Sequence, residues 1–322
     1  MQFTQYKPSL LRQGFVRLCF LGLLTPLAGQ QFGGLRPGIR WQMIDTDTCR
    51  VIFPAQVQKQ GHRIANTIHY LRRYHLSELG DQAFKIDIVL NNQTTETNGF
   101  VGLAPWRSYF FSTPTQNSFG LSATAWMDLL SIHEYRHVIQ RSTARRGITK
   151  WLYNLFGEES WAAASSLAVP DWFAEGDAVW SETVLSGQGR GRIPNFLKGY
   201  RTLALEDKNI SYVKARNGSI RDYVPDHYRL GYLMVDHGQK QYGYSLWKDV
   251  FMDASAYRGM IYPFSNALKR VTGASTRDFY ENMISERTDL WKQRQTMMQA
   301  RPVYHPLQIP KTFTDHLYPR LS

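Results

Sequence analysis

The sequence His133-Glu134-Tyr135-Arg136-His137 places two imidazoles four positions apart, with a carboxylate directly after the first. In a helix, residues four apart lie on one face about one turn apart, so His133 and His137 can present two nitrogen atoms to one metal ion. Glu134 lies beside that face and can reach a water molecule on the metal. Because Zn2+ lowers the pKa of such a water toward neutrality, the carboxylate can take its proton as the water attacks. This spacing predicts hydrolytic chemistry.

The residues around the motif predict the helix that it needs. Trp126, Leu130, His133, His137 and Gln140 recur at helical spacing and form one continuous stripe. The alternative is a core helix whose histidines are only hydrogen-bonded. A third ligand distinguishes the two interpretations, because zinc hydrolases use three protein ligands and leave a fourth position for water.

A second predicted helix, over residues 171–185, supplies the best third ligand. Asp171 follows Pro170 and is a suitable N-cap for this helix. Glu175 shares a helix face with large apolar residues, and a carboxylate on such a face is costly to bury unless it is paired or binds a metal. Glu175 is therefore the candidate third ligand.

The two helices together resemble a known family. A His-Glu-x-x-His helix followed by Trp-Phe-x-Glu-Gly-x-Ala-x-x-x-Glu is similar to the gluzincin metallopeptidases, the thermolysin-like clan with a glutamate as third ligand. The resemblance implies zinc on His133, His137 and Glu175, with Glu134 as the general base. The segment between His137 and Glu175 is longer than in the compact aminopeptidase members of the clan.

Two further acidic residues lie on the second helix. Glu182 is two turns beyond Glu175 on the same face and is a candidate to orient a histidine ligand from outside. The alternative for Glu182 is a solvated or ion-paired carboxylate at the helix end. Asp177 points away from Glu175, so a structural role is expected for it.

A strand is predicted over residues 84–90, followed by a glycine-containing stretch. In gluzincins a strand at the edge of the N-terminal sheet runs above the zinc and pairs with the substrate backbone. The resemblance places Gly99, Phe100, Val101 and Gly102 in that strand, where main-chain hydrogen bonds could hold an extended peptide. An ordinary hairpin strand is the alternative.

The segment 226–243 resembles the helix that gluzincin-like families place behind the site. A tetrahedral intermediate needs a hydrogen-bond donor aimed at its oxyanion, and Tyr228 is the first candidate. His227 and Tyr232 are weaker candidates, and a packed helix aromatic is the alternative for Tyr228. His237 carries no motif and is expected at the surface. The glycine-rich residues 187–192 predict a flexible loop on the rim of the cleft, whose arginines could contact substrate carboxylates.

The order of predicted elements indicates an α+β fold, with a small N-terminal mixed sheet and helices, then a mainly helical half. The resemblance places the zinc site in the cleft between them. Strands are expected near 50–53, 84–90 and within 99–111, and helices over 55–79, 120–141, 171–185, 226–241, 261–271 and 275–298.

The N-terminal residues 1–29 combine basic residues with a short apolar run that ends in small residues, the pattern of a signal peptide. Export to the periplasm or outside the cell is expected, and an uncleaved membrane anchor is the alternative. The mature chain would have no transmembrane span, and Cys49 would have no intrachain disulfide partner.

Residues 30–300 are expected to form the metallopeptidase domain. Residues 301–322 resemble a linker and the opening strand of a TolB-like β-propeller blade, which predicts a propeller in a longer parent chain. An irregular docking tail is the alternative.

Composition limits the classes of partner. The chain is 14% aromatic, which fits a packed core rather than disorder. Its net charge of +12 permits attraction to anionic surfaces. No nucleic-acid motif accompanies the basic cluster Arg141, Arg145, Arg146 and Lys150, so a solvated face or a charge at a helix end is expected there.

These patterns together predict an exported zinc endopeptidase that acts on a peptide or protein. The alternative from another class is a catalytically silent zinc-containing module for binding or assembly, acting with the propeller. An exported aminopeptidase would need an anchor for the substrate amine before the zinc motif, and residues 90–120 contain no such signature.

Overall fold

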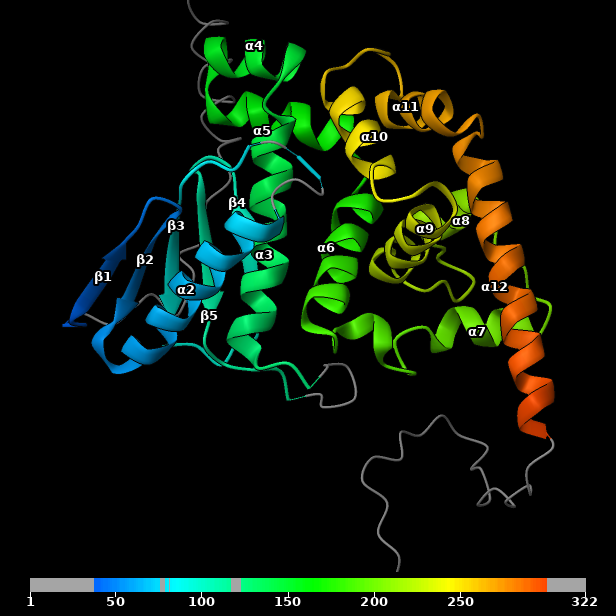
Figure 1. Ribbon diagram of the computed structural model, residues 1–322, viewed down its shortest axis with the longest axis horizontal. Helices are drawn as coiled ribbons and strands as arrows, with labels where there is room; N and C mark the ends of the chain where they lie inside the picture. Colours follow the sequence, from blue (N-terminus) through cyan, green and yellow to red (C-terminus); the bar gives the residue numbers. More distant parts are fainter. Residues whose placement is uncertain (1–37, 76–78, 81, 117–122, 300–322) are drawn as a thin grey trace, which may run out of the picture. The chain divides into compact units, whose positions relative to one another are not determined.

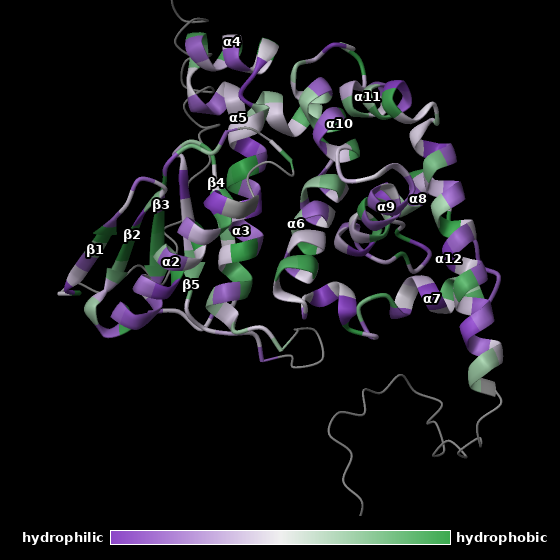
Figure 2. Ribbon diagram, in the orientation of Figure 1, coloured by the Kyte–Doolittle hydropathy of each residue, from purple (hydrophilic) through white to green (hydrophobic). Residues whose placement is uncertain are grey.

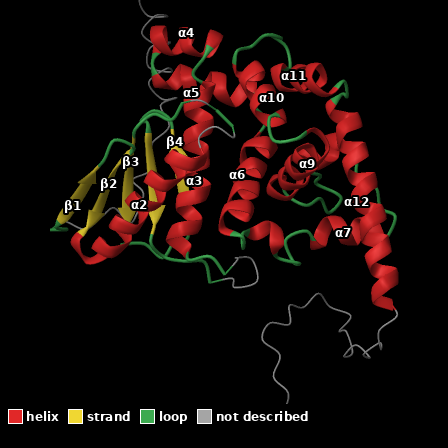
Figure 3. Ribbon diagram, viewed as in Figure 1, coloured by secondary structure: helices red, strands yellow, loops and turns green. Residues whose placement is uncertain are grey.

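The computed structural model describes residues 38–75, 79–80, 82–116 and 123–299. The chain divides after Ile39 into two units, and the account below concerns the second. In it a small mixed sheet is followed by a mostly helical region, which confirms the α+β prediction (Figure 1, Figure 3). The signal peptide predicted at 1–29 and the propeller strand predicted at 301–322 lie outside the described residues.

The sheet has five strands in the order β1-β2-β3-β5-β4. Its central pairs, β2 with β3 and β3 with β5, are parallel, whereas β1 and β4 run antiparallel to their neighbours. Alternate residues of β3 are buried, as expected for a strand with one covered face, and β2 and β3 are mostly green in Figure 2. The strands are β1 (Trp41–Asp45), β2 (Cys49–Pro54), β3 (Ile86–Asn91), β4 (Gly99–Gly102) and β5 (Arg107–Phe111).

The helix after β2 supplies the crossover that two parallel strands need. The short turn η1 (Ala55–Val57) leads into α2 (Gln58–His75), which packs on β2 and on α3. The predicted helix over 55–79 is thus confirmed in its central part. The predicted strand region 99–111 is a hairpin of two strands, and β1 was not predicted.

The helical region carries the remaining elements (Figure 1). They are α3 (Trp126–Ala144), α4 (Gly147–Phe156), α5 (Glu158–Ala168), α6 (Asp171–Ser186), η3 (Arg190–Arg192), α7 (Lys198–Leu205), α8 (Tyr212–Asn217), α9 (His227–Tyr242), α10 (Leu246–Ser255), α11 (Pro263–Thr272) and α12 (Thr276–Gln299). The predicted helices correspond to α3, α6, α9, α11 and α12. Among the described helices, none is long and apolar enough to cross a bilayer.

Helices α6 and α9 cross with their backbones in direct contact. A Cβ atom on Gly176 would lie 2.1 Å from the carbonyl carbon of Gly231, and one on Gly231 would lie 1.7 Å from the carbonyl oxygen of Trp172. Real Cβ atoms cannot approach backbone that closely, so both positions need glycine. The crossing sets α6 and the start of α9 at a fixed distance.

An aromatic cluster anchors the first turn of α6. The rings of Trp172 and Phe173 lie 5.4 Å and 4.9 Å from the ring of Phe264, and Trp247 packs against both. All four side chains are buried. Edge-on and tilted contacts of this kind add to the free energy of burial. They hold the α6 segment that continues into Glu175.

Candidate metal centre

Helices α3 and α6 bring the three predicted ligands together. The Nε2 atom of His133 lies 3.3 Å from Oε2 of Glu175, and Nε2 of His137 lies 3.5 Å from the same oxygen. One potential ligand atom of each residue lies within 4.8 Å of the others. In the described part of the chain, no second group of three His, Cys, Asp or Glu side chains meets this condition.

These separations fit a zinc ion. Tetrahedral zinc with bonds of about 2.0–2.1 Å holds its ligand atoms roughly 3.3 Å apart. Two imidazole nitrogens and one carboxylate oxygen are also the donor set of many catalytic zinc sites, which leave one position open. The donor types and their spacing therefore match zinc.

The outer nitrogen of each histidine is bound by a neighbouring oxygen. Nδ1 of His133 lies 3.0 Å from Oε2 of Glu182, and Nδ1 of His137 lies 2.9 Å from Oε1 of Gln140. Because a carboxylate and an amide oxygen only accept hydrogen bonds, both Nδ1 atoms donate. With a metal bound, the protons would reside on Nδ1, and each Nε2 atom would give its lone pair to the metal in place of a proton.

Arg190 fixes the orientation of Glu182. Its Nε donates to Oε1 of Glu182 at 2.7 Å and its Nη2 donates to Oε2 at 3.0 Å, a two-pronged ion pair. Nη2 also lies 3.0 Å from Nδ1 of His133. Since the carboxylate is the charged acceptor, we assign the hydrogen bonds of both donors to Glu182. The arginine that was expected on the rim of the cleft thus points inward.

The charges around His133 favour a cation at this position. Burial disfavours a charged imidazole, but the hydrogen bonds that His133 donates to the carboxylates of Glu175 and Glu182 outweigh burial and, without a metal, raise the pKa of His133 to about 9. Burial also acts on Glu175, where the two histidines outweigh it and hold the carboxyl pKa well below its usual range. Burial opposes ionisation of Glu182 as well, yet Arg190 and His133 lower its pKa to about 2. The carboxylates stay ionised, as a metal site requires.

Glu134 lies beside the ligands in a pocket of about 300 Å3. It is buried, and burial raises the pKa of its carboxyl group despite the opposing effect of the two histidines. A raised pKa suits a group that must first accept and later release a proton. The pocket also contains His133, Glu182, Arg190 and Tyr228, and its other lining residues are Thr97, Asn98, Gly99, Thr115, Trp126, Leu129 and Leu130.

The side chain of Tyr228 reaches the site from the first turn of α9. Its ring stacks on that of His133 at 6.5 Å, and the guanidinium of Arg190 lies 5.4 Å from its centre. Burial and the charge of Glu175 raise the pKa of Tyr228 to about 12, so the hydroxyl remains a proton donor. The described residues that line the pocket include Tyr228 but neither His227 nor Tyr232.

The strand β4 lies at the end of the strand order and next to the motif helix. A Cβ atom on Gly99 would meet Cδ2 of Leu130 at 2.7 Å and Oε1 of Glu134 at 3.2 Å. A larger residue at this position would have to displace the ends of these two side chains, so glycine lets the strand pass close to the carboxylate. Of the four candidate residues, Gly99 lines the pocket, whereas Phe100 is exposed and contacts Tyr109 with the two rings tilted and 5.1 Å apart.

A buried polar network joins the two ligand-bearing helices behind the site. Arg136 donates from Nε and Nη2 to Asp177 at 2.7 Å and 2.8 Å, and both side chains are almost wholly buried. Gln140 donates to Asp177 at 2.8 Å and to the carbonyl of Ala174 at 2.9 Å. Through Gln140 the network ends on Nδ1 of His137. Asp177 is structural, as the sequence predicted.

Sequence reasoning missed several features of this region. Arg190 was expected in a flexible loop, and Gln140 was noted only as part of a helical stripe. His237 was expected at the surface, which is wrong: it is buried, with Nδ1 2.8 Å from Oε2 of Glu286. In contrast, helical spacing alone identified Glu182 as a residue that could orient a histidine.

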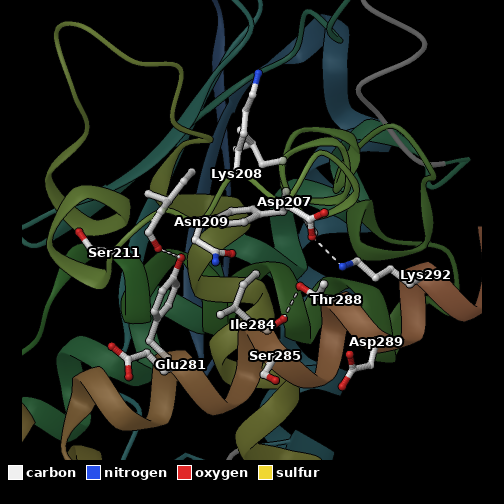
Figure 4. A pocket seen from close by; sticks show the side chains of 15 residues that line it. Asp207, Lys208, Asn209, Ser211, Glu281, Ile284, Ser285, Thr288, Asp289 and Lys292 are labelled. Carbon is white, nitrogen blue, oxygen red and sulfur yellow. Dashed lines mark hydrogen bonds and ion pairs between the residues drawn. The ribbon is translucent and has the colours of Figure 1, made fainter.

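A separate hollow of about 610 Å3 lies between α12 and the segment from α7 to α8 (Figure 4). It contains the ion pair between Lys292 and Asp207, at 2.7 Å. The hollow is larger than the pocket at Glu134 but brings no predicted site residue together. The smaller pocket is therefore the candidate site of chemistry.

No family model and no curated protein matches the chain. Solved structures give weak matches: a mutant of a functionally unknown conserved protein from Bacillus anthracis str. Ames has 10% identity and a TM-score of 0.44, covering 80% of this chain and 52% of the other. A second structure of that description has 12% identity and a TM-score of 0.40, covering 79% and 52%. The chain spans about half the length of these structures, and matches this weak carry no argument about function.

Proposed function

We propose that the protein is an exported zinc-dependent peptidase of gluzincin type, acting within peptide or protein chains. The observation that supports it most is the pair of histidines whose Nδ1 atoms are both occupied by oxygens, so that both Nε2 atoms face Glu175. A merely structural histidine pair needs no such shared orientation. His133, His137 and Glu175 would hold the zinc.

The residues around the ligands fit the proton transfers of hydrolysis. Zinc held there supplies Lewis acidity, which lowers the pKa of water and polarises a carbonyl group. The Glu134 carboxylate takes the proton from the attacking water and returns it to the leaving amine. The Tyr228 hydroxyl, kept protonated by its raised pKa, donates a hydrogen bond to the oxyanion.

The proposed substrate class follows from strand β4. An edge strand beside the general base can bind an extended peptide by main-chain hydrogen bonds. Gly99 lets the backbone of β4 pass close to Glu134. Residues 90–120 carry no signature of an anchor for a substrate amine. We therefore favour internal cleavage over removal of N-terminal residues.

The test replaces Glu134, which has a catalytic role but is not a ligand. We expect Glu134→Gln to keep stoichiometric zinc, measured by elemental analysis, and to lose peptide hydrolysis by about 10²- to 10⁴-fold, because a general base contributes that much. Turnover is measured on a mixture of fluorescence-quenched peptides. Glu159→Gln, at an exposed glutamate of α5, is the matched control and should retain full activity.

Unchanged turnover in Glu134→Gln would refute the mechanism. Zinc in the wild-type protein without any hydrolysis would instead favour the binding or assembly module.

A further inference from the structure

Helix α4 presents an apolar face that nothing in the described chain covers. Ile148, Trp151, Leu155 and Phe156 are 41%, 60%, 55% and 68% exposed. The first three recur at helical spacing, so they form one stripe along the helix. A tryptophan this exposed is unusual, because its large apolar ring is normally buried.

A loop that also exposes large apolar side chains contacts the start of α4. The hydroxyl of Thr149 donates to the carbonyl of Ser255 at 3.1 Å, and Gly147 packs directly on Ala256. Residues 256–262 follow, and α4 and this loop lie at the same end of the described unit (Figure 1). Met260, Ile261 and Tyr262 are 80%, 73% and 73% exposed.

The charges of the two segments are of one sign. Residues 135–157 and 254–277 contain arginines and lysines but no aspartate or glutamate. Lys150 is exposed between the apolar residues of α4, and the Arg258 side chain is 76% exposed in the loop. Of the nearby acids, Asp253 is largely buried and pairs with Arg258 and Arg270. An exposed carboxylate, Glu159, lies beyond the C-terminal end of α4.

We propose that α4 and the loop 256–262 form a docking surface for an anionic lipid bilayer. Protruding tryptophan, leucine, isoleucine and phenylalanine side chains with interspersed lysine are the composition of helices that lie in a membrane interface. Aromatic residues such as Trp151 and Tyr262 favour the headgroup level. Exposed basic residues such as Lys150 are attracted to anionic headgroups, the segments 135–157 and 254–277 contain no carboxylate, and the net charge of +12 strengthens that attraction. The positive charge of this surface would attract a protein partner only if that partner were acidic.

This surface does not depend on the zinc site. The docked protein would hold α4 in the plane of the interface, with the apolar stripe among the acyl chains and Lys150 at the headgroups. It would bind reversibly, because one short helix and a loop bury far less apolar surface than a spanning helix.

The test places an environment-sensitive dye at the surface. The full chain carries Cys19→Ser and Asn154→Cys labelled with nitrobenzoxadiazole, while Cys49 is wholly buried and stays unlabelled. We expect the emission to shift to the blue with phosphatidylglycerol vesicles, and not with pure phosphatidylcholine vesicles. The same dye on Gln295→Cys, at an exposed residue of α12, should not respond.

A second variant tests the residues themselves. Trp151→Ser with Leu155→Ser should weaken co-sedimentation with the anionic vesicles by about tenfold or more, since each buried apolar side chain contributes at least that factor. Met297→Ser with Met298→Ser, at similarly exposed positions, is the matched control. Circular dichroism melting verifies that both variants fold.

Three results would overturn the proposal. One is the absence of a blue shift at position 154 with anionic vesicles at low salt. Another is an equal shift at position 295. The third is a shift at 154 that needs no lipid and grows with protein concentration, which would make this face an interface between copies of the chain.

Discussion

The two histidines proposed as ligands differ in the side chains that bind their outer nitrogen atoms. Glu182 and Arg190 form a charged pair behind His133, whereas a neutral amide, that of Gln140, holds His137. A carboxylate partner increases the basicity of an imidazole ligand, so His133 should be the stronger donor to the metal. The arginine in turn keeps that carboxylate ionised at low solvent exposure.

This arrangement gives a prediction for zinc affinity. Glu182→Gln should weaken zinc binding by about 10- to 100-fold, the typical effect of losing such an outer partner. The dissociation constant is measured by competition with a chromophoric chelator. Because the variant also leaves Arg190 without its anion, we expect a lower melting temperature.

A double variant separates the two effects. Glu182→Gln with Arg190→Gln should recover much of the melting temperature but none of the zinc affinity. Recovery of both would show that Glu182 acts only through packing. Equal zinc affinity in Glu182→Gln and the wild-type protein would contradict the proposed orientation of His133.

Among the individual residues of the site, those on regular helices could be predicted from the sequence. His133, His137, Glu175 and Glu182 all follow from helical spacing, and the structure brings them together. Arg190 could not be predicted in the same way, because a glycine-rich loop has no periodicity and its course depends on the helices around it. A Cβ atom on Gly191, for example, would lie 2.3 Å from the ring of Tyr232, so α9 limits the space for this loop.

The elements that carry the site are joined by two different interactions. Between α3 and α6 the Arg136–Asp177 pair is buried and joined by two hydrogen bonds, and breaking such a pair typically costs about 3–5 kcal/mol. Between α6 and α9 the contact is backbone to backbone at Gly176 and Gly231. The ion pair fixes the position of His133 and His137 relative to Glu175. The glycine crossing fixes the position of Tyr228 relative to Glu175.

The glycine crossing can be tested by adding one methyl group. Gly231→Ala should lower the free energy of unfolding by about 1–3 kcal/mol or more, because the new Cβ meets the Trp172 carbonyl and the helices must separate. Urea denaturation measures the change. Gly102→Ala, whose Cβ would meet nothing closer than 3.4 Å, is the control for stability. Equal stability of Gly231→Ala and the wild-type protein would contradict the close crossing.

The long helices and the ten-residue α11 were predicted, whereas the similarly short α4 and α5 were not. The stripes in α3, α6, α9 and α12 repeat over several turns, which makes their periodicity readable. Helices α4 and α5 are short, and α4 directs its apolar stripe outward, so the usual rule that apolar faces lie inside gives no help. The crossing of α6 and α9 depends on both partners, and no single-helix pattern contains it.

Over the whole described unit, the candidate site joins the sheet-bearing part to the helical part. Helix α3 packs on α2, β4 and β5, and helix α6 packs on α9. The proposed ligands come from both helices, with His133 and His137 on α3 and Glu175 on α6. The sequence predicted this division into halves, whereas β1 and the order of the strands depend on long-range pairing that local patterns do not encode.

Because the proposed ligands come from both parts, zinc bound to them should stabilise the whole unit. A ligand that binds only the folded state adds about 4.1 kcal/mol at a concentration of 1,000 times its dissociation constant. We therefore expect chelation to lower the melting temperature by several degrees and added zinc to restore it, as measured by calorimetry. Glu175→Gln should lose most of this shift, since two histidines on one helix no longer join α3 to α6 through the ion. Glu159→Gln should keep it, and an undiminished shift in Glu175→Gln would exclude Glu175 as the ligand that couples the two helices.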